Sequence, residues 1–300
     1  TTAGSRRNVV ALDATTGEQL WMYRIDEEDR AEQSMRRLSG RGVGYWTDGS
    51  ADERIYFVTI GYQLVALNAQ TGRPITSFGI NGIVDLKQHN DQELDPVKSE
   101  LAWNGAPVVA GNVVLVGAAS RAGGTPPSRR NAKGYVRGFD AKTGERLWIF
   151  HTIPQPGEFG HETWKDDSWE YTGNTGVWTQ MTVDTELGIA YLPVEIPTGD
   201  YYGGHRPGDN LFAESLVAVD VSTGQRIWHF QFVHHPIWDY DVPCAPILAD
   251  ITVDGRMIKA IAQPTKQGWV YVFDRLTGEP VWPIEERPVP AGDFPSETYA

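Results

Sequence analysis

Short apolar runs, separated by turn-forming residues, recur along the chain. Five segments share one form, in which apolar residues lead to Asp or Asn, two variable residues, Thr-Gly, and then polar residues that lead to Trp. They are ALDATTGEQLW (11–21), ALNAQTGRPIT (66–76), GFDAKTGERLW (138–148), AVDVSTGQRIW (218–228) and VFDRLTGEPVW (272–282). The second has Thr76 where the others have Trp. Each segment predicts a β-hairpin: an apolar strand ends at Asp or Asn, Gly takes a positive φ in the turn, and an alternating strand follows.

Further short strands are expected between these hairpins. The apolar runs that predict them lie at 54–60, 112–118, 189–196 and 259–265. Several strands per unit, with Gly, Asp and Trp at fixed places, are typical of the blades of a β-propeller. The repeated tryptophans, which we expect to fill the gaps between adjacent blades, are Trp21, Trp148, Trp228 and Trp282. The last residues, 283–300, form an irregular Pro-rich stretch without a closing strand, so we expect an incomplete ring.

Composition narrows the function classes. The 300 residues carry 26 Lys and Arg against 39 Asp and Glu, a net charge of −13, which disfavours binding to nucleic acid or anionic lipid. The 11 Trp, 32 Gly and 19 Pro disfavour a helical bundle, and the single Cys244 excludes an internal disulfide. No apolar run approaches the roughly 18 residues that span a bilayer. Because the chain begins at Thr1, a leader or a longer N-terminal region could precede it.

The repeat AxDxxTGxxxW resembles the tryptophan docking motif of the quinoprotein alcohol and glucose dehydrogenases, which are all-β, eight-bladed propellers that carry pyrroloquinoline quinone (PQQ). Several segments are similar to the membrane-type quinoprotein glucose dehydrogenases in particular. These are RGVGYW (41–46), YLPVEIPTGDYYGG (191–204), VHHPIWDYDVPCAPILADITVDG (233–255) and PTKQGWVYVFDRLTGEPVWPIEERPVP (264–290). The resemblance covers essentially the whole chain and implies a single, partial propeller domain over 1–300.

The resemblance also implies an activity. Family members oxidise a sugar or alcohol hydroxyl and pass the electrons to PQQ and then to ubiquinone or a cytochrome. A divalent cation, Ca²⁺ or Mg²⁺, accompanies PQQ, and the location is periplasmic, with any membrane attachment through a region outside this chain. The alternative is a cofactor-free propeller that serves as a protein-binding scaffold, as in the outer-membrane assembly lipoproteins. Fold alone does not separate the two, but the segments between the repeats favour the enzyme.

Two charged residues are the candidates for catalysis. Asp239, in HHPIWDYD, aligns with the family's catalytic aspartate, and a carboxylate beside the quinone can take the hydroxyl proton of the substrate. Asp241 is the alternative base. Lys266, in PTKQG, aligns with the basic residue that reaches the quinone oxygens, where a cation stabilises developing negative charge. The structural alternatives are an aspartate that caps a turn and a solvated turn lysine.

Three residues are candidates for cofactor binding. Arg41, in RGVGY, aligns with the arginine that faces the acid groups of PQQ, a tricarboxylate that suits a guanidinium. Trp178, in NTGVWTQM, takes the place of the indole on which the quinone lies flat. Thr198, in PTGDYYGG, matches a threonine that contacts cofactor or metal. An ordinary salt bridge, a core tryptophan and a turn hydroxyl are the respective alternatives.

The metal ligands of the family are not evident. Arg121-Ala122 stands where the glucose enzymes have an Asp-Asn pair, and Arg121 could replace the cation electrostatically. Where the alcohol enzymes place an amide ligand this chain has EIPT, so that Glu195 is the nearby oxygen anion. The metal site therefore stays unassigned. Trp46 replaces a His of the glucose enzymes, which puts glucose itself in question as the substrate.

Other motifs indicate little chemistry. HETWK has Lys165 where a zinc protease helix needs its second His. GRGVG (40–44) is not followed by a helical pattern, so a dinucleotide fold is not expected. His234-His235 could bind a metal, but we expect the pair to line the central funnel or to pack next to Trp238.

Overall fold

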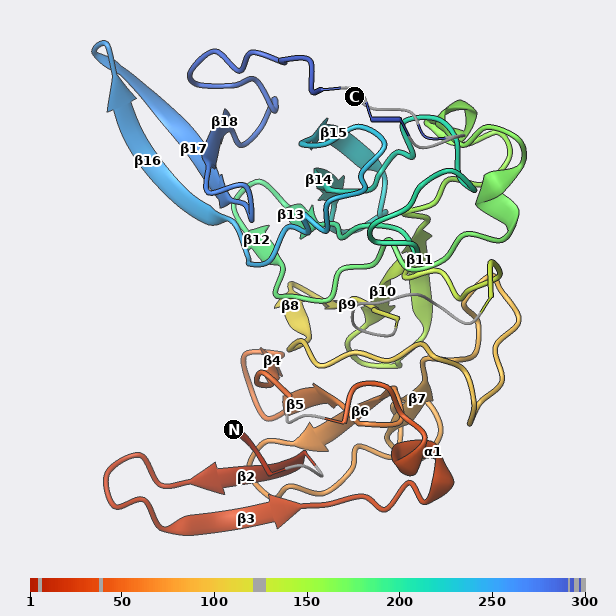
Figure 1. The fold of residues 1–300 in the computed structure, drawn as a ribbon. Coiled ribbons are helices and arrows are strands. Elements are labelled where there is room, and N and C mark those ends of the chain that lie inside the picture. The colour runs from red at the N-terminus through yellow and green to blue at the C-terminus, as the bar shows by residue number, and fades with distance from the viewer. Residues whose placement is uncertain (5–6, 38–39, 121–127, 291, 294–296, 298–300) are drawn as a thin grey trace.

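The computed structural model describes residues 1–4, 7–37, 40–120, 128–290, 292–293 and 297, which form antiparallel sheets of consecutive strands (Figure 1). The first sheet contains β1 (Thr2–Ala3), β2 (Asn8–Leu12) and β3 (Gln19–Tyr23). The second contains β4 (Gly44–Thr47), β5 (Glu53–Val58), β6 (Gln63–Asn68) and β7 (Ile83–Asp85). The third contains β8 (Val108–Ala110), β9 (Val113–Val116), β10 (Val136–Asp140) and β11 (Arg146–Phe150).

The C-terminal half repeats the same arrangement. The fourth sheet contains β12 (Thr182–Asp184), β13 (Ile189–Pro193), β14 (Ser215–Asp220) and β15 (Arg226–Gln231). The fifth contains β16 (Ile247–Val253), β17 (Arg256–Pro264) and β18 (Val270–Asp274). The helices are short: α1 (Asp29–Glu32) and the 3₁₀ turns η1 (His161–Thr163) and η2 (Ser168–Glu170). The strands predicted between the hairpins are confirmed as β5, β9, β13 and β17, with different ends.

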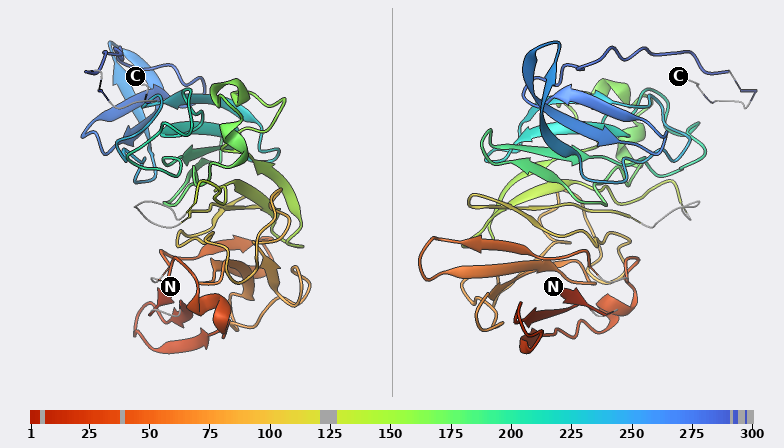
Figure 2. Two further views of the ribbon diagram at one scale, coloured as in Figure 1. Left: turned by 45° about the vertical axis from the view of Figure 1, so that its right-hand side comes forward. Right: turned by 90° about the vertical axis from the view of Figure 1, so that its left-hand side faces the viewer.

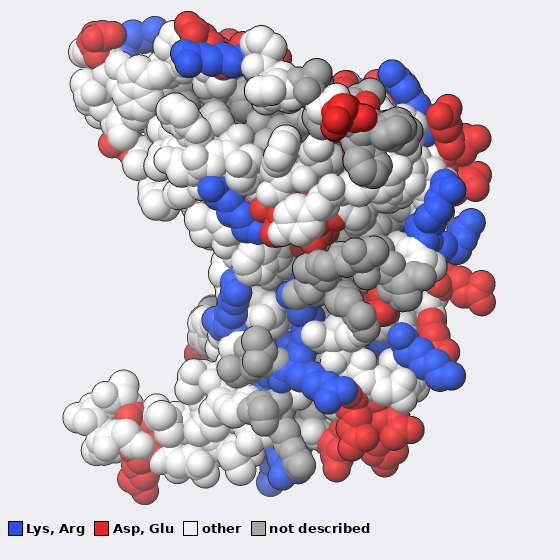
Figure 3. All heavy atoms as spheres, viewed as in Figure 1, with Lys and Arg blue, Asp and Glu red and all other residues white. Residues whose placement is uncertain are grey.

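The sheets follow one another in chain order from the N-terminal to the C-terminal end of the molecule (Figures 1 and 2). The first strands of successive sheets touch: β4 contacts β8, β8 contacts β12, and β12 contacts β16. The space-filling view is hollowed on its left side, between the N-terminal and C-terminal ends (Figure 3). Sheets of up-and-down strands whose first strands meet are the blades of a propeller. The expected propeller is confirmed, and the described residues form five blades of it.

The Thr-Gly turns have the predicted conformation. Asp13 Oδ1 accepts hydrogen bonds from the backbone N–H groups of Thr15, at 2.9 Å, and Thr16, at 2.7 Å. Gly17 has a φ of 74°. The side chain at this position caps the turn, and Gly takes the left-handed conformation without a steric cost. The same Asx bonds recur in the other four repeats, at Asn68, Asp140, Asp220 and Asp274.

The repeated tryptophans join neighbouring blades as predicted. The indole Nε1 of Trp21 donates to Ala69 O at 3.0 Å, across the boundary between the first and second sheets. A Cβ placed on Gly72 would lie 2.5 Å from the Trp21 ring, so only glycine allows this contact. Trp148 and Trp228 contact the turn glycines of the next repeats in the same way. Trp282 instead is 52% exposed, because no later repeat within the described residues covers it.

The second repeat, which lacks the tryptophan, uses another residue at the blade boundary. Phe78 is fully buried, and a Cβ on Gly144 of the next repeat would lie 3.1 Å from its ring. The backbone N–H of Gly79 also donates to Thr143 O at 2.7 Å. Phe78 therefore fills the space that Trp fills at the other boundaries, and Thr76 does not leave a gap.

The alternation of strand direction brings distant residues to one end of the blades. In an antiparallel four-stranded sheet, the connection between the second and third strands and the segment that enters the next sheet lie at the same end. The Thr-Gly turns lie at the opposite end. Arg41, Trp178 and Asp239 precede first strands, whereas Thr198 and Lys266 lie between second and third strands. All five candidate residues are thus at one end of the propeller.

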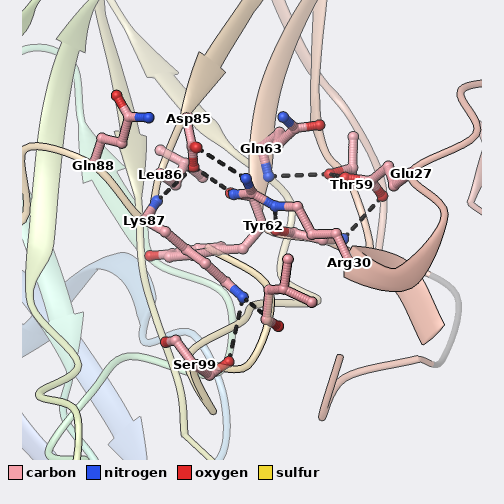
Figure 4. Close-up of polar contacts among 12 residues, drawn as sticks. Glu27, Arg30, Thr59, Tyr62, Gln63, Asp85, Leu86, Lys87, Gln88 and Ser99 are labelled. Atoms are coloured by element: carbon pink, nitrogen blue, oxygen red, sulfur yellow. Dashed lines mark hydrogen bonds and ion pairs between the residues drawn. The ribbon is translucent and has the colours of Figure 1, made fainter. Parts of the chain in front are cut away.

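A polar cluster fastens α1 to the second blade (Figure 4). Arg30 Nη1 donates to Asp85 Oδ2 at 2.9 Å, and the Lys87 N–H donates to Asp85 Oδ1 at the same distance. Thr59 Oγ1 donates to Glu27 Oε1 at 2.6 Å. Burial alone would raise the pKa of Asp85, but these donors hold it below its ordinary value. We call Glu27, Arg30, Thr59, Asp85 and Lys87 the α1 cluster.

Candidate functional site

The two candidate catalytic residues are in contact. The Lys266 ammonium donates to Asp239 Oδ1 and to Asp241 Oδ2, both at 3.0 Å. The Asp239 side chain is 30% exposed, whereas the Asp241 side chain is 12% exposed. The turn between β17 and β18 and the segment before β16 therefore meet in one ion-paired group. Of the two aspartates, Asp239 has the carboxylate that a molecule from solution can reach.

Asp241 is held from two sides. Its Oδ1 accepts the Ile196 N–H at 2.9 Å, so this carboxylate also fixes the loop after β13. Burial raises the pKa of Asp241 above its ordinary value, partly opposed by the Ile196 N–H and by Lys266. Burial would lower the pKa of Lys266, but the charges of Asp241 and Asp239 outweigh that effect and raise it. Lys266 is thus held as a cation.

Asp239 lies in an unusual local backbone. Its φ is 52°, a left-handed conformation that costs an aspartate energy and is common at functional sites. The hydroxyl of Tyr201, on the loop after β13, donates to Asp239 Oδ2 at 3.4 Å. Tyr201 is 69% exposed. The long bond and the exposure leave Asp239 Oδ2 the more available of the two carboxylate oxygens.

Two buried glutamates flank Asp241. Glu195 is 4% exposed and Glu214 is fully buried. Glu195 Oε1 and both carboxyl oxygens of Glu214 have no hydrogen-bond partner. Burial, followed by the charge of Asp241, raises the pKa of each glutamate well above its ordinary value, although Arg36 opposes the rise at Glu195. We call Asp239, Asp241, Lys266, Glu195 and Glu214 the acid cluster.

The sequence pointed to Glu195 but not to Glu214. Glu214 lies immediately before β14, in the segment AESLVAVD, where no motif distinguishes it from a solvent-exposed acid before a strand. Tyr201 likewise lies in the segment YLPVEIPTGDYYGG (191–204), where the sequence alone indicates no role for it. Their positions beside Asp241 and Asp239 follow from the packing of two consecutive blades, which local sequence patterns do not encode.

A chain of hydrogen bonds connects the loops at this end of four blades. Arg36 Nε donates to Ser120 O at 3.1 Å, and the Ser120 N–H donates to Asn174 Oδ1 at 3.0 Å. Asn174 Nδ2 in turn donates to Ile196 O at 2.9 Å, and the Ile196 N–H donates to Asp241. The polar groups of these connections therefore support one another, which fixes the acid cluster relative to the earlier blades.

Arg41 and Trp178 form a second group. The Arg41 guanidinium carbon lies 5.0 Å from the centre of the Trp178 ring, a cation–π contact. Arg41 Nη1 donates to Thr179 Oγ1 at 3.4 Å, and Thr179 Oγ1 donates to Pro243 O at 3.0 Å. Thr179 thus connects this pair to the segment that carries Asp239. The indole Nε1 of Trp178 is buried without a hydrogen-bond partner.

Thr198 takes a supporting position. It is 8% exposed, and its hydroxyl oxygen accepts the Gly173 N–H at 3.1 Å. The loop that it closes also contains Ile196 and Tyr201. Thr198 therefore shapes the loop that reaches both aspartates.

The structure also shows where several other residues that the sequence singles out lie. Trp46 is buried in the core, where its Nε1 donates to Asn112 Oδ1 at 3.2 Å and Lys142 of a Thr-Gly turn lies 5.6 Å from its ring. It thus points toward the opposite end of the blade and does not line the site, so its identity does not bear on the substrate there. HETWK contributes a single 3₁₀ turn, and GRGVG leads into β4. Arg121 and Ala122 lie outside the described residues.

The donor groups fit an anionic aromatic cofactor better than a metal. Arg41, Lys266 and the Trp178 ring offer positive charge and a flat apolar surface, the chemistry that a planar polycarboxylate needs. Within the described ranges, no group of three or more His, Cys, Asp or Glu side chains could hold a metal ion. In the same ranges no helix is long and apolar enough to cross a membrane.

Comparisons with known proteins agree on the family. A family model described as "PQQ: Glucose/ethanol/alcohol dehydrogenase, beta-propeller domain" matches residues 1–300. The chain is 33% identical to the quinoprotein glucose dehydrogenase of Escherichia coli over 96% of this chain and 36% of that protein. It is also 33% identical to the glycerol dehydrogenase large subunit of Gluconobacter oxydans, over 96% of this chain and 38% of that protein. The chain thus spans little more than a third of these relatives.

A solved structure supports the same assignment. The quinohemoprotein alcohol dehydrogenase ADHIIG of Pseudomonas putida HK5 superposes with a TM-score of 0.77 at 30% identity, over 93% of this chain and 39% of that one. A europium-containing methanol dehydrogenase superposes with a TM-score of 0.73 at 25% identity, over 92% of this chain. The five blades correspond to part of the larger propellers in these proteins.

Proposed function

This chain belongs to the PQQ-dependent glucose/ethanol/alcohol dehydrogenase β-propeller family, and we propose that the complete protein oxidises a sugar or alcohol hydroxyl. The observation that carries the proposal is the position of Lys266, which is held between a partly exposed Asp239 and a buried Asp241. Relatives named for glucose, glycerol and quinate support a hydroxyl-bearing substrate. The electron acceptor of the complete protein would be a quinone or a cytochrome.

Arg41 and Trp178 are the residues that would hold the cofactor. The Arg41 guanidinium would pair with a carboxylate of PQQ, and the Trp178 ring would supply the surface on which the flat ring system lies. When bound, PQQ supplies the oxidising power, accepting two electrons and the hydrogen of the carbinol carbon. Thr179, which contacts Arg41 and Pro243, would keep this pair in place relative to Asp239.

Asp239 would take the hydroxyl proton. As the C–H bond of the carbinol breaks and a carbonyl forms, the O–H proton must leave, and it passes to the Asp239 carboxylate. Oδ1 of this carboxylate is bonded to Lys266, so Oδ2 is the acceptor, and the substrate hydroxyl would replace the weak bond from Tyr201. Asp241 is less accessible to a substrate because it is buried and both of its oxygens are engaged.

Lys266 would stabilise negative charge beside the reacting atoms. Its raised pKa keeps it protonated at neutral pH, and an ammonium at a fixed position stabilises developing charge without reorganisation. Asp241 would act through Lys266 by holding its side chain. Asp241 is therefore a positioning residue, and the alternative assignment of the base to Asp241 is not favoured.

Family membership also implies a divalent cation and an extracytoplasmic setting. The described residues contain no cluster of three or more His, Cys, Asp or Glu side chains that could hold a metal ion, and no step of the mechanism is assigned to the metal. We propose a periplasmic location. The family that the sequence motifs resemble passes electrons to ubiquinone or a cytochrome, which places such enzymes at the outer face of the inner membrane.

The test is reconstitution of the full-length protein with PQQ and Ca²⁺. PQQ binding is measured by calorimetry, and turnover by dye reduction with a panel of sugars, polyols and primary alcohols. We expect stoichiometric binding, weakened at least tenfold in Trp178→Ala, and turnover with at least one substrate. Failure of the wild-type protein to bind PQQ would favour the cofactor-free scaffold.

A further inference from the structure

The two consecutive histidines before the catalytic segment have different surroundings. The pair formed by His234 and Glu286 lies at the surface, with side chains 38% and 80% exposed. The pair formed by His235 and Glu297 is buried, with side chains 2% and 3% exposed. One histidine of HHPIWDYD thus contacts the C-terminal segment at the surface, and the other contacts it in the interior.

The Glu297 carboxylate is enclosed by groups from two loops. Its Oε1 accepts the Gly203 N–H at 2.6 Å, and its Oε2 lies 3.0 Å from His235 Nε2. His235 Nδ1 lies 2.9 Å from Gly208 O, and since a carbonyl oxygen only accepts, Nδ1 carries a hydrogen and donates it. A hydrogen must then lie between Nε2 and Oε2 as well, because two lone pairs would repel each other. Every polar atom of this pair therefore has a partner.

The sequence at this position permits the close approach. A Cβ on residue 203 would lie 2.6 Å from His235 Nε2, so Gly203 is required for the imidazole to reach the carboxylate. Arg206, which is fully buried, adds a positive charge that acts on Glu297. Its Nη1 is bonded to Asn210 at 2.8 Å and its Nη2 to Gly199 O at 3.0 Å. The surroundings of Glu297 thus include a backbone N–H, an imidazole and a nearby positive charge.

The two loops joined by Glu297 are the ones that form the proposed site. Gly203 lies on the loop that carries Thr198 and Tyr201, and His235 begins the segment that carries Asp239. His235 has a φ of 46° and Asp239 a φ of 52°. Such conformations persist only where the surroundings hold them. The bond from His235 to Glu297 is one of the contacts that hold this segment.

We propose that Glu297 is a positioning residue, which fixes the Tyr201 loop and the Asp239 segment relative to each other through Gly203 and His235. Glu297 does not contact the reacting atoms. Its carboxylate contacts both the Tyr201 loop and the Asp239 segment, so that these two parts of the site and the residue Glu297 meet at one place. The consequence for turnover rests on the proposed function, whereas the consequence for local stability does not.

The experiment compares Glu297→Gln with Glu286→Gln in the full-length protein. The first substitution keeps the size of the side chain and removes the carboxylate from the buried pair, and the second does the same at the exposed pair. Amide hydrogen exchange is followed over residues 199–206 and 234–241, and kcat and PQQ affinity are measured on the same samples. His235→Gln is a second variant of the buried pair, in case Glu297→Gln is poorly folded.

We expect Glu297→Gln and His235→Gln to raise the exchange rate of the Gly203 amide and its neighbours at least tenfold. We expect kcat to fall about tenfold to a hundredfold, since a misplacement of about 1 Å at a reacting group costs this much, with PQQ affinity unchanged. Glu286→Gln should change none of these quantities. Unchanged exchange in both buried-pair variants overturns the proposal, and so does faster exchange with an unchanged kcat. Absence of turnover in the wild-type protein, with faster exchange in the variants, would refute the proposed function. The structural role of Glu297 in joining the two loops would still hold.

Discussion

Two groups of charged residues at the same end of the propeller differ in how their charges are satisfied. In the α1 cluster, Asp85 receives bonds from Arg30 and from a backbone N–H, and its pKa is lowered (Figure 4). In the acid cluster, Glu195 and Glu214 are buried with unpaired oxygens, and their pKa values are raised well above the ordinary one. The first group gains stability from its charges, and the second tolerates an electrostatic cost. Buried groups kept at such a cost are common at functional sites.

The difference has a simple origin in the fold. The α1 cluster lies where a helix packs on one blade, so that nearby backbone and side-chain donors can saturate each carboxylate. The acid cluster lies between consecutive blades, where loops from β13, β15 and β17 bring several acids together around one cation. Lys266 contacts two of these acids and cannot neutralise the others. The comparison therefore supports a structural role for the α1 cluster and is consistent with the catalytic role proposed for the acid cluster.

The largest expected effect is on turnover in Asp239→Asn. The amide cannot accept the hydroxyl proton, so kcat should fall by about 10²–10⁴, while the free energy of unfolding changes little because the side chain is 30% exposed. Dye-linked turnover of the full-length, PQQ-loaded protein measures the effect. Asp85→Asn is the matched control in the α1 cluster and should retain its kcat. A kcat of Asp239→Asn within twofold of the wild-type value would remove Asp239 as the base.

Lys266→Met should have the next largest effect. Loss of the ammonium removes a preorganised positive charge, which we expect to lower kcat about a hundredfold. Lys87→Met is the control, because Lys87 is buried, has a pKa lowered to about 8 chiefly by burial, and contacts backbone carbonyls of the connection between β7 and β8. Its removal should leave kcat unchanged. Equal kcat values for the two variants would contradict the role of Lys266.

Asp85→Asn should affect stability in place of turnover. Because the folded-state pKa of Asp85 is lowered, its ionised form stabilises the fold above the pKa of the unfolded state, and this contribution is lost as pH falls. We expect the variant to lose about 1–3 kcal/mol of unfolding free energy at neutral pH and to approach the wild-type value as pH falls below the pKa of the unfolded state. Urea unfolding across this pH range measures the difference. A difference that grows as pH falls would have the wrong sign.

Glu214→Gln should show the opposite pH dependence and the smallest effect. The folded-state pKa of Glu214 is raised, so stability is greatest below the unfolded pKa and falls as pH rises through the folded one. Glutamine removes the titrating group, and the variant should therefore lose less stability than the wild type between about pH 4.5 and neutrality. Parallel stability curves for wild type and variant would show that Glu214 is not held in its neutral form.

The sequence alone was sufficient for the features that depend on local spacing. The Thr-Gly turns follow from an Asp or Asn that two variable residues separate from Thr-Gly. Trp21, Trp148 and Trp228 each meet the next repeat one blade later. The substitution of Phe78 for tryptophan at one boundary was not predicted, because Phe78 lies outside the repeat motif. Its place depends on how the chain after Thr76 folds back.

The candidate site was predictable only in part, and mostly through the resemblance to a family. Asp239 and Lys266 are 27 residues apart, and their contact follows from pairing a connection before β16 with the turn after β17. Arg36 and Asn174 join the site through hydrogen bonds that cross blades, and no local pattern distinguishes them. Trp46 stands where the glucose enzymes have His, and the structure places it in the core.

The most direct measurement is a single turnover of the full-length protein loaded with PQQ under anaerobic conditions. An alcohol or sugar substrate is added, and the absorbance of the bound quinone and the amount of carbonyl product are recorded together. The account predicts that the wild-type protein and Asp85→Asn reduce one equivalent of quinone and form one equivalent of product, whereas Asp239→Asn retains oxidised quinone. A wild-type protein whose quinone stays oxidised with every substrate, or an Asp239→Asn variant that reacts at the wild-type rate, would contradict it.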